Sequence, residues 1–392
     1  MKSRAEAKLL VVDDNPENRD LLTRRLRRLG YSDMVQATDG VEALEALAGG
    51  SFDVVLLDVM MPRMNGVDVL TRMREERRLE RTAVIMISAA TELETVVQCI
   101  ELGAEDYLPK PFNPILLQAR LGSVVDKMIL RAESRAHLDR LEHELAEARR
   151  QQLQMVTRDF PFPTAAMPVS VHATMHPARE VGGDLYDAFE AAPGVLCIAL
   201  GDVSGKGVPA ALFMARTRSL LRAATLQHVA ITGAVPNPSA IVTVINEELC
   251  KNNPGTMFVT LFYGLLDLGT GKLRFVNAGH VHPYVLGRDG SVTIVEQTSG
   301  PPMGVIDFAS HAEFELDLGA GDGLIVLSDG LPEMEDASGA YYSLERLEED
   351  FKELGSAAAD VFLAKLVERV MNFTGGVAQA DDVTALVLRR PA

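Results

Sequence analysis

The sequence predicts a multi-domain protein: an α/β doubly wound parallel sheet, a helical coiled-coil linker, and an α+β sandwich of two sheets flanked by helices. Residues 8–121 alternate short apolar runs with amphipathic segments, which is typical of a parallel sheet covered on both faces. Beyond residue 160, runs of strands with few helices indicate two sheets packed face to face. A chain of 392 residues is too long for one ordinary core. We expect domains at 1–121, 122–157 and 158–392.

Composition excludes several classes of protein. The hydrophobic fraction of 47% and the charged fraction of 24% are typical of soluble globular domains. A net charge of −17 argues against nucleic acid as the main partner, because phosphate binding needs a basic face. No apolar run is long enough to cross a membrane, and Met1–Glu6 leads into a strand, so we expect a cytoplasmic protein without a membrane partner. The three cysteines lie in separate apolar runs and are expected to be buried thiols.

The elements of the first domain follow from its apolar periodicity. Short continuous runs predict buried strands, and three- or four-residue spacing predicts helices. The expected strands cover residues 9–12, 54–57, 84–87 and 107–108, and the expected helices cover 16–29, 66–75, 91–102 and a segment from Pro114.

Polar side chains follow four of these strands. They are Asp13, Asp14, Asp58, Ser88 and Lys110. Any one alone would be explained as a solvated charge at a loop end. Because ligands of parallel sheets sit at the carboxyl ends of the strands, we expect all five to converge. Three carboxylates, a hydroxyl and an ammonium would hold a hard cation beside an anionic group, which suits the transfer of a phosphoryl group to a carboxylate.

Together with Met61-Pro62, Gly66 and Lys110-Pro111, this set resembles a response-regulator receiver domain. The resemblance implies that Mg²⁺ is held by Asp13, Asp14 and Asp58, and that a sensor histidine kinase phosphorylates Asp58. It further implies that Lys110 and Ser88 contact the phosphoryl group and that Tyr107 is the switch aromatic. We also expect a cis peptide bond before Pro111.

The linker shows heptad spacing in two runs of different phase. The first run is Leu121, Val125, Met128 and Ala132, and the second is Leu138, Leu141, Leu145, Ala148, Gln152 and Met155. One interpretation is a single solvated connector helix. The other is a parallel two-stranded coiled coil with a stutter, which would make the protein a homodimer. Phe160-Pro161-Phe162-Pro163 is expected to end the helix.

In the last domain, apolar runs again predict strands and longer periodic segments predict helices. Strands are expected near residues 169–175, 185–189, 195–200, 258–266, 272–277, 284–286, 292–295, 313–316, 324–327 and 383–388, and helices near 208–224, 238–251 and 356–372. Residues 224–238, rich in small residues and proline, are predicted to form a mobile loop.

The stretch Gly201–Ala211 joins a buried strand to a helix through an acidic, glycine-rich turn. It could be a tight structural turn, a phosphate loop or a metal site. The phosphate-loop spacing does not fit, because Gly207 follows Lys206 where a hydroxyl is required. Strand-end carboxylates also occur at Asp184, Asp329 and Asp381-Asp382. Like charges brought together need a cation to offset their repulsion, which favours a metal site.

Five motifs in order resemble the metal-dependent (PPM, PP2C-like) protein phosphatases of the SpoIIE type: Gly182–Asp187, Gly201–Gly207, Asn277–His280, Ser328–Gly330 and Asp381–Thr384. The resemblance implies two Mn²⁺ or Mg²⁺ ions that share a bridging water. Their ligands would be Asp184, Asp202 as the bridge, the Val203 carbonyl, Asp329 and Asp381. Exchanging the roles of Asp381 and its neighbour Asp382 is an open alternative. Asn277 and His280 are either a phosphate contact and a general acid or braces of a turn between strands.

The main hypothesis is therefore a two-component response regulator whose phosphorylation at Asp58 controls a serine/threonine protein phosphatase. The resemblance implies a phosphoprotein substrate, specifically a phosphorylated anti-sigma-factor antagonist. The alternative is a catalytically silent adaptor that binds within a sigma-factor pathway. The four aspartates that the metals require are all present, which disfavours the adaptor. A DNA-binding regulator is disfavoured by the acidity and by the lack of a recognition helix.

Overall fold

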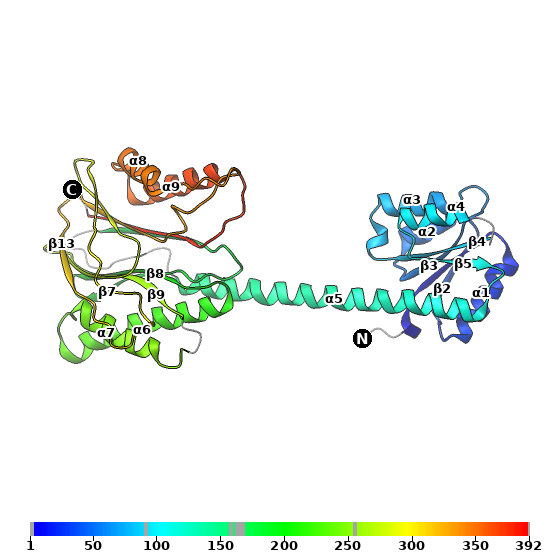
Figure 1. Cartoon of the computed structure of the whole chain (residues 1–392), viewed down its shortest axis with the longest axis horizontal. Coiled ribbons are helices and arrows are strands. Elements are labelled where there is room, and N and C mark those ends of the chain that lie inside the picture. The colour runs from blue at the N-terminus through cyan, green and yellow to red at the C-terminus, as the bar shows by residue number, and fades with distance from the viewer. Residues whose placement is uncertain (1–3, 90–92, 157–159, 161–168, 254–256, 391–392) are drawn as a thin grey trace. The chain divides into compact units, whose positions relative to one another are not determined.

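The computed structural model describes residues 4–89, 93–156, 160, 169–253 and 257–390. The chain divides into two compact units, Met1–Glu142 and His143–Ala392. Figure 1 labels the elements of both units.

The first unit is a five-stranded parallel sheet in the order β2-β1-β3-β4-β5. Its strands are β1 Leu9–Val12, β2 Met34–Ala37, β3 Val54–Asp58, β4 Ala83–Ala89 and β5 Asp106–Lys110. Its helices are α1 Pro16–Arg28, α2 Gly40–Gly49, α3 Gly66–Glu75, α4 Leu93–Leu102 and the first part of α5 Pro114–Met155, with two short 3₁₀ turns, η1 Arg4–Glu6 and η2 Arg78–Glu80. The doubly wound fold is confirmed.

Both faces of this sheet are buried, which explains why its central strands are continuous apolar runs. One core cluster joins the sheet to α1 and α5, and a second joins it to α2, α3 and α4. Residues 34–37 and 40–49 were not predicted as elements. β2 is an edge strand with only one fully buried residue, so it lacks an apolar run, and α2 begins at an Asp39 side chain that caps Val41 and Glu42.

The second unit contains two mostly antiparallel five-stranded sheets, ordered β13-β10-β9-β8-β7 and β12-β11-β14-β15-β6. The strands are β6 Ser170–His176, β7 Leu185–Ala192, β8 Val195–Val203, β9 Val259–Asp267, β10 Lys272–Ala278, β11 Tyr284–Leu286, β12 Val292–Ile294, β13 Phe314–Asp317, β14 Gly323–Leu327 and β15 Val383–Arg389. The helices are α6 Val208–Thr232, α7 Pro238–Cys250, α8 Leu344–Leu354 and α9 Ala359–Thr374.

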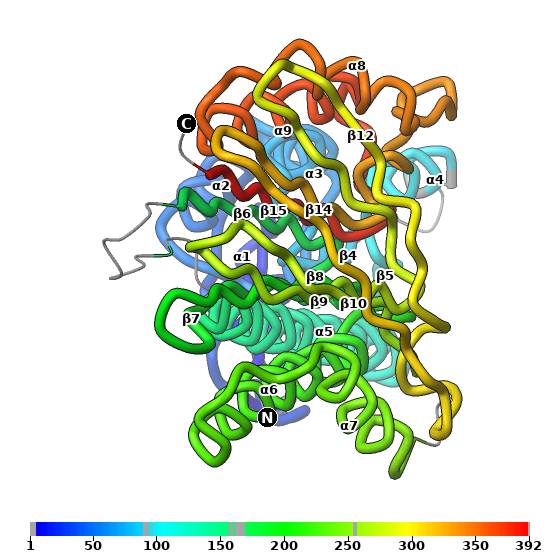
Figure 2. The backbone as a smooth tube through the Cα atoms, turned by 90° about the vertical axis from the view of Figure 1, so that its left-hand side faces the viewer, coloured from blue at the N-terminus to red at the C-terminus, as the bar shows by residue number. Residues whose placement is uncertain are grey.

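These elements form four layers, which Figure 2 shows with α6 and α7 outside one sheet and α8 and α9 outside the other. The central core cluster lies between the sheets and includes Tyr186, Ile198, Phe262, Phe275 and Leu386. Separate clusters join each sheet to its own helix pair. The predicted sandwich of two sheets flanked by helices is confirmed.

The mobile loop predicted at 224–238 is wrong for its first half. Helix α6 continues to Thr232, because Leu221 and Thr225 lie on its buried face, and it ends at Gly233 in a left-handed conformation. Helix α8 was not predicted as an element, although its apolar residues Leu347 and Phe351 are fully buried. Among the described residues, no helix is both long and apolar enough to cross a membrane.

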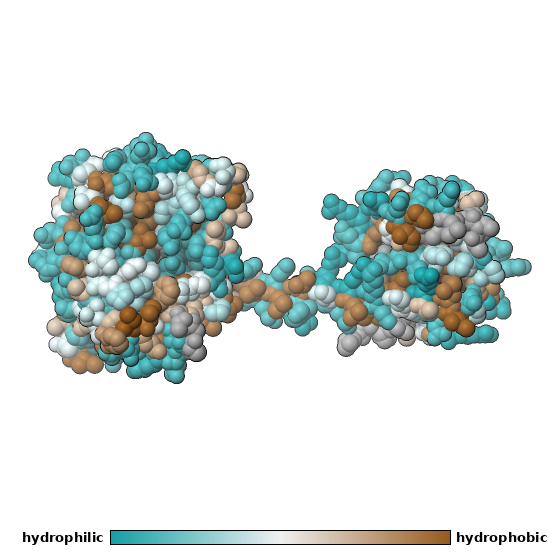
Figure 3. Space-filling view, viewed as in Figure 1, coloured by the Kyte–Doolittle hydropathy of each residue, from teal (hydrophilic) through white to brown (hydrophobic). Residues whose placement is uncertain are grey.

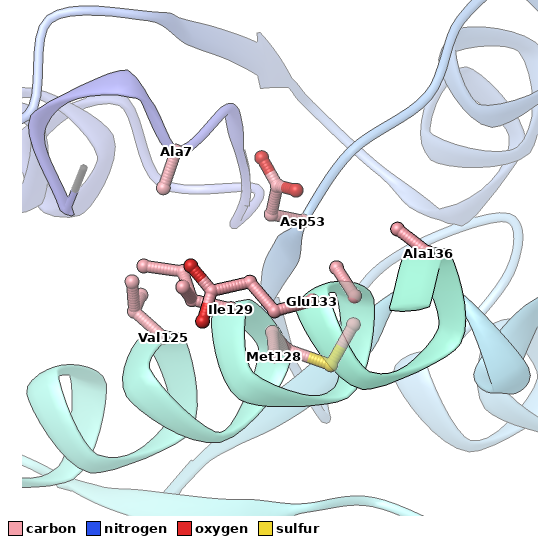
Figure 4. Close-up of a pocket in the computed structure, with 8 residues that line it drawn as sticks. Ala7, Asp53, Val125, Met128, Ile129, Glu133 and Ala136 are labelled. Carbon is pink, nitrogen blue, oxygen red and sulfur yellow. The ribbon is translucent and has the colours of Figure 1, made fainter. Parts of the chain in front are cut away.

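Helix α5 is continuous over 42 residues, but its two heptad runs meet different surroundings. Leu121, Val125 and Met128 of the first run are buried in the core of the first unit. Figure 4 shows Val125, Ile129 and Glu133 along the side of α5 that lines a pocket with Ala7 and Asp53. The first run therefore packs within its own chain and does not offer these side chains to a partner helix.

The second run is different in its first half. Leu138 is 56% exposed and Leu141 is 41% exposed, and Figure 3 shows hydrophobic side chains at the surface along the middle of α5. This part of the helix retains an uncovered apolar seam.

The two runs should respond differently to truncation. We expect Leu121→Ala to lower the unfolding free energy of the first unit by about 2–5 kcal/mol, because it leaves a cavity in a packed core. Leu138→Ala should change it by less than about 0.5 kcal/mol, because that residue is 56% exposed. Thermal denaturation of the full chain at low protein concentration measures both. Equal effects of the two substitutions would contradict the assignment of the first run to the core.

Candidate functional site

The first candidate site lies at the carboxyl edge of the parallel sheet. Asp13 follows β1 and Asp58 ends β3, and each of Asp13, Asp14 and Asp58 places a carboxylate oxygen within 4.8 Å of the others. Three hard oxygen ligands at this spacing fit a divalent cation such as Mg²⁺. Among the described residues, no other set of three acidic, histidine or cysteine side chains is so tightly grouped.

Lys110 connects this cluster to the end of β5. Its Nζ lies 2.8 Å from Asp58 Oδ2 and 2.9 Å from Asp13 Oδ2. The peptide bond between Lys110 and Pro111 is cis, as expected. Ser88 is buried at the end of β4, and the Arg120 guanidinium lies 5.3 Å from the centre of the Tyr107 ring. The structure thus brings the lysine and the three predicted carboxylates together.

Burial dominates the electrostatics of this edge. Removal from water raises the pKa of Asp58 to about 6, the Lys110 ammonium opposes that rise, and the Asp13 and Asp14 carboxylates add to it. One ammonium therefore does not fully compensate the acidic cluster. A cation placed there would supply the remaining positive charge.

The raised pKa of Asp58 has a measurable consequence for stability. The Asp58 carboxyl binds a proton more tightly in the folded protein than in the unfolded protein. The ionised carboxylate therefore lowers the unfolding free energy, and this loss of stability develops as pH rises from about 4 to 6 and is complete at pH 7. Asp58→Asn removes it and should stabilise the first unit by about 1–2 kcal/mol at pH 7 in EDTA, after allowance for partial exposure.

Calorimetry of the full chain measures this difference, with the exposed Asp20→Asn as control. Mg²⁺ should shrink the difference, because it favours the ionised carboxylate in the parent protein. If Asp58→Asn is no more stable than the parent in EDTA, the electrostatic description of this edge is wrong.

The second candidate site lies in the second unit, where Asp184 immediately precedes β7. The Asp184 side chain is buried, and neither of its carboxylate oxygens has a hydrogen-bond partner among the described residues. Burial raises the pKa of Asp184 well above its usual range, and the nearby carboxylates of Asp202 and Asp382 raise it further. A buried carboxylate with two free oxygens is a demanding arrangement that a bound cation would satisfy.

Two further carboxylates share this environment. Asp202 lies near the end of β8, and burial raises its pKa to about 7, with a further rise from Asp329 and Asp381. Asp329 follows β14, and its pKa is also raised by burial and by the charge of Asp381. Each of these carboxylates disfavours ionisation of its neighbours, and a divalent cation between them would offset that repulsion. The residues present therefore fit divalent metal ions.

The Ser328–Gly330 turn and the start of β15 are held together by their backbones. The Ser328 amide donates to the Thr384 carbonyl over 2.9 Å, and the Thr384 amide donates to Ser328 Oγ over 3.0 Å. A Cβ at Gly330 would lie 2.0 Å from the Asp382 carbonyl oxygen, so only glycine permits this approach. These contacts place Asp329 beside Asp381.

The adjacent aspartates Asp381 and Asp382 point to different partners. Asp382 is buried, and its carboxylate accepts hydrogen bonds from the amides of Ala178, Gly183 and Asp184. The Asp381 carboxylate remains partly exposed and lies 2.9 Å from Lys206 Nζ. Asp382 thus holds the turn that carries Asp184, whereas the Asp381 side chain stays 39% exposed beside Lys206.

His280 and Asn277 brace a turn. His280 is buried, its Nδ1 lies 2.8 Å from Thr260 Oγ1, and its amide donates to Asn277 Oδ1 over 2.7 Å. Burial lowers the pKa of His280 to about 3, so it carries no proton to donate as an imidazolium near neutral pH. This geometry supports the bracing interpretation and argues against a general acid.

A buried ion pair beneath this site was not predicted. Asp187 of β7 is fully buried and binds two arginines of α6, with Arg222 Nε at 3.0 Å and Arg218 NH2 at 3.2 Å from its Oδ2. The two arginines are four residues apart and so share a helix face, which was the available signal. They fix α6, whose first turn follows the Asp202 loop, onto the sheet.

Comparison with known proteins connects this geometry to a family. The family profile for Stage II sporulation protein E (SpoIIE) matches residues 192–391, just over half of the chain. The chain belongs to the SpoIIE family. The response regulator receiver domain profile matches residues 9–122. Chemotaxis protein CheY-3 of Vibrio cholerae is 34% identical over 121 residues, which cover 31% of this chain and 93% of that protein. A CheY-like receiver thus precedes the SpoIIE-type domain.

Other relatives match the second unit or more. Protein IcfG of Synechocystis is 29% identical over 240 residues, which cover 56% of this chain and 38% of IcfG. The crystal structure of the RsbU and RsbW domains of Rv1364c from Mycobacterium tuberculosis has 26% identity and a TM-score of 0.51, covering 60% of this chain and 63% of that one. The chain therefore spans less than two thirds of either relative.

A further structure supports the fold alone. The SiaA-PP2C domain of Pseudomonas aeruginosa has 20% identity and a TM-score of 0.53, and the match covers 65% of this chain and 98% of that domain. The PP2C-like fold of the second unit is thus shared with a protein of low sequence identity. The metal ligands proposed for this SpoIIE-family chain rest on its own residues.

Proposed function

We propose that this chain is a response regulator whose phosphorylation at Asp58 controls a metal-dependent serine/threonine protein phosphatase. The observation that carries the proposal is the buried Asp184 carboxylate, whose two oxygens lack partners beside Asp202. The oxygens of a purely structural aspartate would accept hydrogen bonds from nearby amides. The Asp382 carboxylate does so, because it accepts from the amides of Ala178, Gly183 and Asp184.

The ligands of two Mn²⁺ or Mg²⁺ ions would be Asp184, Asp202, the Val203 carbonyl, Asp329 and Asp381. Such ions, when bound, would lower the pKa of a water and stabilise negative charge on the oxygens of the phosphoryl group. The protein supplies the rest. Asp382 and the Asp187 ion pairs hold the loops that carry the ligands, and the partly exposed Lys206 ammonium balances Asp381. No side-chain nucleophile is needed.

The receiver would control this output. In the proposal, Asp58 accepts a phosphoryl group from a sensor histidine kinase while Asp13 and Asp14 help to hold Mg²⁺. Lys110 already lies at hydrogen-bond distance from Asp58 and would contact the phosphoryl oxygens. Ser88, near the carboxyl end of β4, and Tyr107, on the neighbouring strand β5, would respond to the new charge.

The proposed substrate is a phosphorylated anti-sigma-factor antagonist or a similar small regulatory protein. This part rests on the family and on the resemblance to a protein described by its RsbU and RsbW domains. A rival is a silent adaptor, which would have no need for a buried Asp184 beside the partly buried Asp202 and Asp329.

We also propose a homodimer through the second half of α5. Leu138 and Leu141 are exposed at heptad spacing and continue to Leu145. A second copy of this helix segment is the partner that matches its exposed leucines in length and periodicity. In a coiled coil, the a and d side chains of one helix pack into the holes between side chains of the other. The seam would bury leucines that the single chain leaves in water.

Phosphatase activity is the direct test. The full chain should hydrolyse p-nitrophenyl phosphate only with Mn²⁺ or Mg²⁺, and Asp202→Asn and Asp329→Asn should each lower turnover at least about a hundredfold, because each removes charge from the metal cluster. The exposed turn variant Asp289→Asn is the matched control and should retain parental turnover. A parent protein that binds no Mn²⁺ and hydrolyses nothing would favour the adaptor.

An insertion series tests coupling through the dimer. Seven residues added after Arg140 preserve the phase of the second heptad run, so control of turnover by beryllofluoride should survive. Three or four residues rotate one end of the helix relative to the other and should fix activity either high or low. Asp58→Ala, which cannot accept the phosphoryl group, is the unresponsive reference. If all insertions respond like the parent, or if the chain is monomeric throughout, α5 is only a spacer.

A further inference from the structure

The last turn of α5 carries a buried polar side chain that the proposed chemistry does not use. Gln152 is 5% exposed, whereas the two nearby glutamines, Gln151 and Gln154, are exposed. Its Nε2 donates to the Gly182 carbonyl over 2.7 Å, and its Oε1 accepts from the Gly182 amide over 3.0 Å. The amide group therefore satisfies both backbone groups of one residue.

Gly182 stands two residues before Asp184, in the turn that leads to β7. The same turn is held from its other side by Asp382, whose Oδ2 accepts from the amides of Gly183 and Asp184 at 2.6 and 3.3 Å. A Cβ at Gly182 would lie 2.4 Å from that oxygen, so the turn packs closely against Asp382. The conformation of the Asp184 backbone is thus set by two side chains, one of them on α5.

The end of α5 is itself fixed to the second unit. Val156 is buried in the core between the two sheets, and Leu153 packs against the same core. Phe160, a few residues later, contacts the Tyr186 ring edge-on at 6.3 Å between centroids. Packing on its C-terminal side therefore supports Gln152 in the position where it makes its two hydrogen bonds.

We propose that Gln152 is a positioning residue, which holds the Gly182–Asp184 turn in the conformation that aims the Asp184 carboxylate at the acidic cluster. The inference rests on the proposed function, because the cluster is taken as the metal site. Gln152 also belongs to the second heptad run. A rotation of α5 about its axis would withdraw the amide from Gly182, so the regulatory helix and the metal turn meet at this side chain.

The test uses the full chain and two substitutions. Gln152→Met keeps the length of the side chain and removes both hydrogen bonds, and Gln152→Glu keeps the acceptor for the Gly182 amide but cannot donate to its carbonyl. Gln151→Ala and Gln154→Ala, on the exposed side of the same turn, are the matched controls.

The first measurement is amide hydrogen exchange without metal. Exchange of the peptide that contains Gly182 should accelerate at least about tenfold in Gln152→Met, less in Gln152→Glu, and not in the controls, while peptides from β9 and β14 keep parental rates. Acceleration across the whole unit would mean a merely structural role. Parental exchange at Gly182 in Gln152→Met would likewise overturn the proposal.

The second measurement is Mn²⁺ binding by titration calorimetry, with hydrolysis of p-nitrophenyl phosphate against Mn²⁺ concentration. In Gln152→Met the Mn²⁺ concentration for half-maximal rate should rise at least about tenfold, while turnover at saturating Mn²⁺ stays within about threefold of the parent. Unchanged Mn²⁺ affinity would overturn the proposal. If the parent itself binds no Mn²⁺, the phosphatase proposal fails, and the exchange measurement still decides whether Gln152 holds the turn.

Discussion

Both candidate sites gather carboxylates that are wholly or partly removed from water, with too little positive charge beside them. In the first unit a single ammonium, that of Lys110, faces both Asp13 and Asp58. In the second unit Lys206 forms an ion pair with Asp381, and the Asp184 carboxylate has no hydrogen-bond partner among the described residues. Removing a charged group from water costs several kcal/mol unless the group is paired. The carboxylates of both sites therefore need a bound cation in order to stay ionised at low cost. The two unrelated folds thus share one electrostatic requirement.

Much of the fold could be predicted because buried strands leave a direct trace in the sequence. Val54–Asp58 is buried at every position, and its apolar run is visible without a structure. Edge strand β2 and helix α8 leave weaker traces, because their burial is partial or their charged residues dominate the composition. The end of α6 was missed for another reason, since small residues near Ala224 suit a loop as well as a tightly packed helix.

The candidate sites could be predicted in part, because strand-end aspartates are local signals. No local sequence signal tells which of Asp381 and Asp382 faces the cluster. The choice depends on amides near residue 183, about two hundred positions earlier in the chain, that capture Asp382. No motif includes Gln152, and its partner Gly182 lies thirty residues later, outside α5, so the sequence does not predict this contact. Periodicity marks Gln152 as inward-facing and does not say which surface it faces.

Helix α5 shows what heptad spacing leaves undetermined. The same repeat is covered by the first unit at Leu121 and Val125, uncovered at Leu138, and covered by the second unit at Gln152. Side chains along an α-helix keep a fixed angular relation of about 100° per residue, so residues that share a heptad phase lie along one face of the helix. The uncovered middle is where a partner helix could act on that relation. At Gln152 the repeat meets the turn that carries Asp184, through two hydrogen bonds to Gly182.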